Sequence, residues 1–179
     1  MPSVKDITSL MRSPSKDDVA LIEKAYGFAE RSHEGHLRFS GDPFFTHVFA
    51  VAKTLAEFGV GAKTIAAGLL HDVIEDTPAT AEDVRAEFGG EILSLVEGVT
   101  KLGTLKYRGL TRHVESLRKL FVAVARYIRV LIIKFADRLH NMQTLEHVPA
   151  HKRRRIAEET LEIYAPLAYR LGMRALNRE

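Results

Sequence analysis

The sequence predicts an all-α protein, a single helical bundle of about eight helices. Apolar residues recur every three or four positions through most of the chain, as on the buried face of an amphipathic helix. Capping residues, glycines and prolines separate these segments. The one β-branched run, Ile128–Ile133, could form a buried strand, but no partner strand is available elsewhere, so we interpret it as helix.

Length and composition fit one globular domain. The chain has 179 residues, of which 46% are hydrophobic and 27% charged, enough to bury a core. We expect residues 1–14 to form an N-terminal arm, either loose or holding a short helix, and residues 15–179 to form the domain. The sequence contains no cysteine, so disulfides and thiolate metal ligands are excluded.

The net charge and the hydropathy of the chain limit the kinds of partner that we expect. The net charge of +3 suits an anionic ligand but is too small to imply nucleic-acid binding by itself. Apolar runs are too short to span a bilayer, and the N-terminus lacks the pattern of a secretion signal. We therefore expect a cytoplasmic protein without a membrane or nucleic-acid partner.

The N-terminal third contains two predicted helices. A serine cap followed by acidic residues predicts a helix over residues 15–32. Residues 33–41 read as a loop. Asp42 and Pro43 then predict the cap and the first turn of a second helix, which ends near Gly59.

The central part is predicted to be helical with one basic loop. A helix over residues 62–76 is followed by shorter helices over 80–89, which has a capping-box-like start, and 91–102. The interval 103–112 contains Lys106, Arg108 and Arg112 together with two glycines. It could close over an anionic ligand, although a solvated connection is favoured. Residues 113–126 are predicted to form the next helix.

The C-terminal third contains the helix that includes Ile128–Ile133 and a last helix over residues 150–171. This last helix begins with a basic run at residues 151–155. Such a run usually marks a solvated face. Cations in a first helical turn oppose the helix dipole, however, which leaves room for a binding role.

The strongest chemical signal lies at residues 68–78, where four ionisable residues interrupt an apolar segment. On a helix, His71 would lie above Glu75 and Asp72 above Asp76. Buried carboxylates need a cation, and imidazole beside carboxylate suits a divalent metal of the Mn, Fe or Zn type. A polar helix end with acids near a turn remains the alternative from this pattern alone.

Two further polar features lie on apolar helices. Asp137, Asn141 and Thr144 follow one another at helical spacing, and such a stripe is costly unless its members serve one another or a ligand. His47 lies within an apolar stripe, where a lone histidine is more often a hydrogen-bonded core residue than a metal ligand.

Three segments in order carry a resemblance to a known family. They are Arg-Phe-Ser-Gly-Asp-Pro-Phe-Phe-Thr-His at 38–47, His-Asp-Val-Ile-Glu-Asp at 71–76 and Lys-Phe-Ala-Asp-Arg-Leu-His-Asn-Met at 134–142. From about Ala29 to Leu171 the chain resembles the HD-domain hydrolase module of the RelA/SpoT homologue family, which degrades the alarmones ppGpp and pppGpp. The resemblance implies a single HD-domain helical bundle.

The resemblance also implies roles for individual residues. It implies that one Mn²⁺ ion is bound by His47, His71, Asp72 and Asp137. It implies that the catalytic acids are Glu75 and Asp76. It implies that the nucleotide site is lined by Arg38, Ser40, Asn141 and Thr144.

Some positions depart from the family pattern. Phe39 stands where a lysine is usual, which puts one positive contact with the substrate in doubt. Val48 replaces a common proline, and Ser116 replaces a common asparagine. Long family members continue into a synthetase domain, so the sequence is interpreted as a standalone hydrolase or an excised hydrolase domain.

The expected reaction is metal-dependent hydrolysis of the 3′-diphosphate of (p)ppGpp, giving GDP or GTP and pyrophosphate and ending stringent-response signalling. Three alternatives are kept. The domain could be an HD phosphohydrolase that acts on another nucleotide, or a catalytically silent nucleotide-binding regulatory module. A basic RNA-binding protein is the third, and it rests only on residues 151–155.

Overall fold

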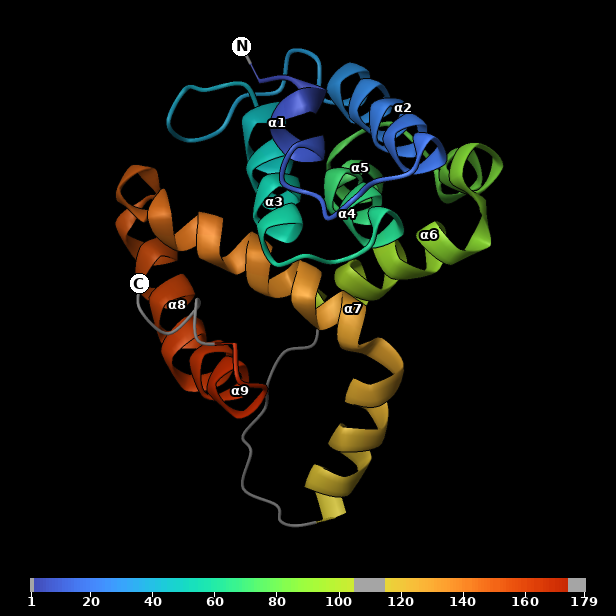
Figure 1. The fold of residues 1–179 in the computed structure, drawn as a ribbon. Coiled ribbons are helices and arrows are strands. Elements are labelled where there is room, and N and C mark those ends of the chain that lie inside the picture. The colour runs from blue at the N-terminus through green and yellow to red at the C-terminus, as the bar shows by residue number, and fades with distance from the viewer. Residues whose placement is uncertain (1, 105–114, 174–179) are drawn as a thin grey trace.

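The structure is a computed structural model that describes residues 2–104 and 115–173, with side chains described up to residue 102 and from residue 128. Helices make up its regular structure (Figure 1), which confirms the predicted all-α class. Within the described ranges, extended pairing is limited to one isolated bridge between Leu37 and Pro43. The basic interval 103–112 lies almost wholly outside the described residues.

Helix α4 (Ala62–Leu69) forms the centre of the bundle. It packs against α2 (Lys16–Ser32), α3 (Phe45–Glu57), α6 (Ala81–Thr104) and α7 (Glu115–Gln143). All but one of its residues are buried, and most are small, so the surrounding helices approach it closely. Two of these neighbours carry polar residues singled out in the sequence, since His47 lies on α3 and Asp137 on α7.

The first residues of the chain contribute to the same core. Helix α1 (Val4–Thr8) is short, and its Ile7 is fully buried in the main apolar cluster. The helix begins with a capping box between Ser3 and Asp6. A short helix, rather than a loose segment, therefore occupies part of residues 1–14.

The local signals for α2 and α3 had different outcomes. Ser15 caps α2 as predicted, because its hydroxyl accepts a hydrogen bond from the Asp18 backbone N–H at 3.1 Å. The predicted cap of α3 is wrong. That helix begins at Phe45, and the Asp42 carboxylate accepts a hydrogen bond from the Ser40 hydroxyl at 2.7 Å instead. The side chain of Asp42 thus stabilises the loop rather than the helix end.

The helix predicted over residues 62–76 is broken in the structure. Helix α4 ends at Leu69 and α5 (Val73–Asp76) begins after a turn. Within this turn Leu70 has φ −101° and ψ 0°, and Asp72 has φ −99° and ψ −4°. The prediction of one continuous helix is therefore wrong, and the break falls at the His-Asp pair.

Helix α6 contains the two helices predicted between residues 80 and 102. Thr80 and Asp83 form the expected capping box, with the Thr80 N–H donating to Asp83 Oδ2 at 2.8 Å. The kink lies at Gly89, where φ is 79°, a value that glycine adopts without strain. The prediction of two helices separated here is confirmed.

The C-terminal part consists of α7 and one further helical segment, which contains α8 and α9 (Figure 1). Helix α7 is continuous, so the prediction of separate helices on either side of residue 127 is wrong. After a 3₁₀ turn, residues 150–170 are helical without a break, which agrees with the helix predicted over 150–171. A π-helical turn (Thr160–Tyr164) divides this helix into α8 (Ala150–Glu159) and α9 (Ala165–Arg170).

This C-terminal helical segment packs on α7 through a second apolar cluster that includes Phe135 and Ala168. In the described part of the chain, no helix combines the length and the apolar character that crossing a membrane requires.

Candidate metal centre

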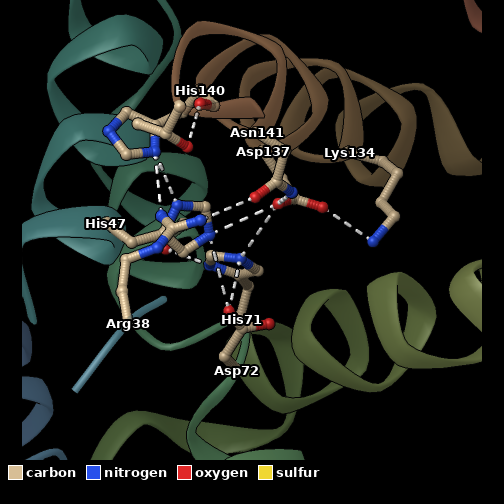
Figure 2. A network of polar contacts seen from close by, with 10 residues as sticks. Arg38, His47, His71, Asp72, Lys134, Asp137, His140 and Asn141 are labelled. Carbon is tan, nitrogen blue, oxygen red and sulfur yellow. Dashed lines mark hydrogen bonds and ion pairs between the residues drawn. The ribbon is translucent and has the colours of Figure 1, made fainter. Parts of the chain in front are cut away.

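Side chains from three separate parts of the chain converge beside α4. His47 comes from α3, His71 and Asp72 from the turn between α4 and α5, and Asp137 from α7 (Figure 2). Nitrogen and oxygen atoms of His47, His71 and Asp137 lie within 4.8 Å of one another, and all three residues are buried. Asp72 Oδ2 lies 3.6 Å from His47 Nε2 and 3.1 Å from His71 Nε2.

The broken helix explains how His71 is oriented. Because α4 stops at Leu69, the carbonyl of Gly68 is available to the His71 side chain, whose Nδ1 lies 2.8 Å from it. A carbonyl oxygen only accepts, so Nδ1 carries the hydrogen and Nε2 of the neutral ring carries a lone pair. Nε2 is fully buried and has no hydrogen-bond partner in the described structure.

The centre requires a positive charge. His71 Nε2 faces Asp72 Oδ2 at 3.1 Å and Asp137 Oδ1 at 3.9 Å, and His47 Nε2 faces Asp137 Oδ1 at 3.3 Å. Lone pairs on imidazole and carboxylate repel one another at such distances unless a proton or a cation lies between them. Imidazoles and carboxylates together form the donor set of Mn, Fe and Zn sites, so these side chains fit a divalent metal ion.

Ionisation of the metal-free centre reflects the same requirement. Burial by itself would lower the pKa of His71, but the neighbouring charge of Asp72 raises this pKa to about 9. Burial would raise the pKa of Asp137, but contacts with His47 and with the Lys134 amine hold it well below its ordinary value. Lys134 Nζ lies 2.7 Å from Asp137 Oδ2. Protons on His71 and Lys134 therefore balance the carboxylates when no metal ion is bound.

A second layer of polar contacts surrounds the centre. Arg38, from the loop before α3, donates to Nδ1 of His140 at 3.0 Å and to Oδ1 of Asn141 at 2.9 Å. Asn141 Nδ2 donates in turn to Asp137 Oδ1. His140 Nδ1 also lies 2.9 Å from Nδ1 of His47. The loop arginine is thus connected to two of the candidate ligands.

An open cavity of about 370 Å³ lies against the centre. Its walls combine cations, carboxylates and aromatic rings, and they are formed by Leu37, Arg38, Phe39, Phe44, His47, Asp72, Lys134, Asp137 and Asn141. This volume is in the range of small-molecule sites. The composition of the walls suits a ligand that has both a ring and negatively charged groups.

Five of the predicted site residues lie outside this lining, and one of them is the fully buried His71 of the metal centre. The Ser40 hydroxyl donates to Asp42 at 2.7 Å, and the Thr144 hydroxyl donates to the backbone carbonyl of His140 at 2.9 Å. Glu75 and Asp76 are exposed on α5. Burial, together with the charges of Asp72 and Glu75, raises the pKa of Asp76. The two acids therefore lie near the ligand pair in the chain but not among the walls of the described cavity.

His140 is the site residue that sequence reasoning missed. Its position three residues after Asp137 on the same helix is the signal that could have identified it. That spacing alone did not distinguish it from an ordinary surface histidine.

Together, the helical bundle and its His-Asp centre define a class, that of helical domains built to hold a divalent cation beside a polar cavity. The chain is a member of the HD domain family, whose pattern matches residues 25–174. Its sequence relatives place it with the HD domains of the RelA/SpoT homologues.

Three of these relatives show how far the similarity extends. The chain is 50% identical over 165 residues to the bifunctional (p)ppGpp synthase/hydrolase SpoT of Escherichia coli K12. It is 52% identical over 158 residues to a GTP pyrophosphokinase of Streptomyces coelicolor. It is 51% identical over 154 residues to the guanosine-3′,5′-bis(diphosphate) 3′-pyrophosphohydrolase of Haemophilus influenzae. These matches cover 92%, 88% and 84% of this chain but only 24%, 18% and 22% of the relatives.

A solved structure shares the fold along most of its length. It is a metazoan ortholog of SpoT, described as hydrolysing ppGpp and as having a role in starvation responses. The TM-score is 0.58 at 25% sequence identity, and the match covers 80% of this chain and 81% of that one.

Proposed function

We propose that this domain hydrolyses the 3′-diphosphate of ppGpp and pppGpp, releasing pyrophosphate and leaving GDP or GTP. In a cell this reaction would end stringent-response signalling. One observation carries the proposal, namely the convergence of buried His47, His71 and Asp137 with the partly exposed Asp72 around a position that requires a cation. Relatives about half identical to this chain and named for this reaction, such as the Haemophilus influenzae protein, support the choice of substrate.

The four side chains would bind Mn²⁺, with Nε2 of each histidine and one oxygen of each aspartate as donors. When bound there, a divalent cation supplies a Lewis acid that acidifies water and withdraws charge from a phosphoryl oxygen. Asn141, which donates to Asp137, would hold that carboxylate in position. Lys134 would offset negative charge at the inner end of the cavity.

The acids on α5 would handle protons. Glu75 and Asp76 follow Asp72 within one helical turn, and this closeness in the chain supports a role beside the metal centre. In the proposed reaction one carboxylate orients or deprotonates the attacking water and the other assists the leaving 3′-oxygen. Arg38 would contact the guanine or a phosphate group from the cavity wall. Ser40 and Thr144 lie close in sequence to residues that line the cavity, and we propose that they complete the nucleotide site.

The test is incubation of the purified protein with ppGpp and Mn²⁺, followed by identification of the products. The proposal expects pyrophosphate and GDP, loss of both when a chelator is added, and recovery when Mn²⁺ is restored. Parallel reactions with Mg²⁺, Zn²⁺ or Fe²⁺ in place of Mn²⁺ identify the ion that supports the reaction. Release of orthophosphate instead of pyrophosphate would contradict the bond assigned here. Turnover of a 3′-phosphorylated dinucleotide or a deoxynucleotide, but not of ppGpp, would identify a different substrate.

A further inference from the structure

The aromatic residue at position 39 has a cationic neighbour from a distant part of the chain. Lys152 Nζ lies over the Phe39 ring, 4.9 Å from its centroid. Phe39 lines the cavity and is nevertheless 62% exposed, so its part of the wall lies at the mouth. Lys152 belongs to the first turn of α8 and is also exposed. Figure 1 shows the loop between α2 and α3 reaching toward the end of α7, where the chain turns into α8.

The arginines that follow Lys152 have oxygen partners of their own. Arg153 donates to the backbone carbonyls of Glu146 and Val148. Arg154 pairs with Glu158 at 2.7 Å, and Arg155 with Glu159 at 3.7 Å. These interactions stabilise α8 and the turn before it. Lys152 differs from them, since its described side-chain contact is with an aromatic face and with no carboxylate.

The cations deeper in the cavity also have partners. Arg38 donates to His140 and Asn141, and Lys134 is paired with Asp137 at 2.7 Å. An ammonium group has three N–H donors, and contact with an aromatic face leaves some of them available to bind an anion. Among the described residues around the mouth, Lys152 is therefore the cation best placed to receive a phosphate group from solvent.

The orientation of the nucleotide follows from the proposed function, on which this inference rests. If the 3′-diphosphate lies at the metal centre, the 5′-diphosphate is the anionic end farthest from it. That end must leave the inner cavity, because Asp72 and Asp137 occupy the inner wall and repel a second group of phosphates. Among the described residues of the lining, Leu37 and Phe39 are the large apolar side chains that are exposed, so the cavity opens to solvent beside them.

We propose that Lys152, held at the mouth by the Phe39 ring, binds the 5′-diphosphate of the nucleotide. Phe39 acts as a positioning residue that restricts the lysine side chain and so reduces the entropy lost on binding. The positive charge that the family resemblance leads one to expect at position 39 is supplied from α8 instead. Residues 38 and 39 of one loop thus serve the two ends of the ligand.

The proposal is tested by comparing GDP with guanosine, because the two differ only in the 5′-diphosphate. Affinities of the Mn²⁺-loaded protein for both are measured by calorimetry in the wild type and in Lys152→Gln, Lys152→Arg, Phe39→Leu and Arg154→Gln. Arg154→Gln is the matched control, since it removes the same charge two positions along the same helix. Its carboxylate partner and its 83% exposed side chain place it away from the ring.

Lys152→Gln is expected to weaken GDP binding about fivefold, as for a solvent-exposed charged hydrogen bond, and to leave guanosine binding unchanged. Lys152→Arg retains the GDP affinity, and Phe39→Leu loses about twofold. The KM for ppGpp rises with the loss in GDP affinity, whereas kcat stays within about twofold because the residue is remote from the reacting bond.

Three results would overturn the proposal. They are an unchanged GDP affinity in Lys152→Gln, an equal loss for GDP and guanosine, and the same loss in Arg154→Gln. The second result would mean that the base stacks on Phe39. If the wild type binds GDP but releases no pyrophosphate from ppGpp, the proposed function fails. The GDP and guanosine comparison still decides the phosphate contact in that case, because it requires no turnover.

Discussion

Nδ1 of His47 lies 2.9 Å from Nδ1 of His140, and this contact determines which nitrogen of His47 faces the metal centre. Arg38 donates to the same His140 nitrogen at 3.0 Å, and a guanidinium has no acceptor and keeps its charge. His140 Nδ1 must therefore carry a lone pair. Nδ1 of His47 then carries the hydrogen, and its Nε2 directs a lone pair toward Asp137. Figure 2 shows the contacts of His140 with both Arg38 and His47.

Replacing His140 should therefore weaken metal binding even though it is not one of the proposed ligands. His140→Leu removes the acceptor and is expected to lower Mn²⁺ affinity about 10- to 100-fold, the usual cost of losing a group that orients a ligand. His140→Asn retains an oxygen acceptor near Nδ1 and should stay within a few-fold of the wild type. Competition with a fluorescent chelator measures the affinities, and unfolding of the metal-free variants controls for stability. Wild-type affinity in His140→Leu would disprove the role.

The same histidine should make the metal-free domain sensitive to acid. Burial, then the charges of His47 and Arg38, lowers the pKa of His140 to about 4, against about 6.5 in the unfolded chain. Between these values the unfolded state binds the extra proton, so the stability due to neutral His140 is present above pH 6.5 and lost toward pH 4. His71, with a pKa near 9, contributes in the opposite direction, and its stabilisation is lost between pH 6.5 and 9.

We expect the thermal unfolding temperature of the chelator-treated protein to fall by several degrees between pH 7 and pH 5. His140→Asn should reduce this fall, whereas the same substitution at His151, whose side chain is exposed, should leave it unchanged. Circular dichroism at each pH provides the measurement. An equal fall in the wild type and His140→Asn would show that other groups, such as His33 and His47, account for the acid sensitivity.

Local sequence signals were sufficient for much of the fold. The helix predicted over residues 15–32 is found at Lys16–Ser32, because its cap and its buried stripe both lie within the segment. The turn at residues 70–72 escaped prediction for a physical reason. Leu69 and Val73 are buried with or without the break, so hydrophobic periodicity is the same for a continuous helix and a broken one.

The candidate site was predictable only in part. A paired histidine and aspartate in an apolar segment indicated a metal, but periodicity could not bring His47 and Asp137 to that pair. The family resemblance supplied that step, and the structure places their side chains together. The role of His140 could not be inferred from the sequence, because it depends on Arg38, which lies 102 positions away along the chain.

Gly68→Ala is expected to destabilise the domain. A Cβ at this position would overlap Leu55 Cδ1, and Leu55 is fully buried in α3, so relief requires α3 and α4 to move apart. Overpacking of this kind costs about 1–3 kcal/mol of unfolding free energy. Gly90→Ala is the control, since a Cβ there meets nothing within 4 Å. Urea unfolding of the metal-free proteins measures both, and equal stability of Gly68→Ala and wild type would contradict the packing described.

The same substitution should weaken metal binding, because the Gly68 carbonyl accepts the hydrogen bond that orients His71. We expect a loss of several-fold in Mn²⁺ affinity, measured by chelator competition at a temperature where the variant is fully folded. Gly90→Ala should bind Mn²⁺ as the wild type does. A destabilised Gly68→Ala that retains full affinity would show that the orientation of His71 does not depend on the spacing of α3 and α4.

Asp72→Ala and Glu75→Ala should both abolish turnover but differ in metal content. Asp72 Oδ2 faces both histidines, so its loss should remove bound Mn²⁺ together with activity. Glu75 is exposed on the turn that follows Asp72. Its replacement by alanine should lower kcat about 100- to 10,000-fold, as expected for the loss of a proton-transfer group, and should leave Mn²⁺ binding intact. Glu82→Ala, at an exposed acid on α6, is the control and should behave as the wild type. Mn²⁺ affinity is measured by calorimetric titration and turnover by pyrophosphate release. The two measurements together distinguish the loss of a metal ligand from the loss of a catalytic group. Normal turnover in Glu75→Ala would exclude that carboxylate from the mechanism, and Mn²⁺ bound tightly by Asp72→Ala would exclude Asp72 as a ligand.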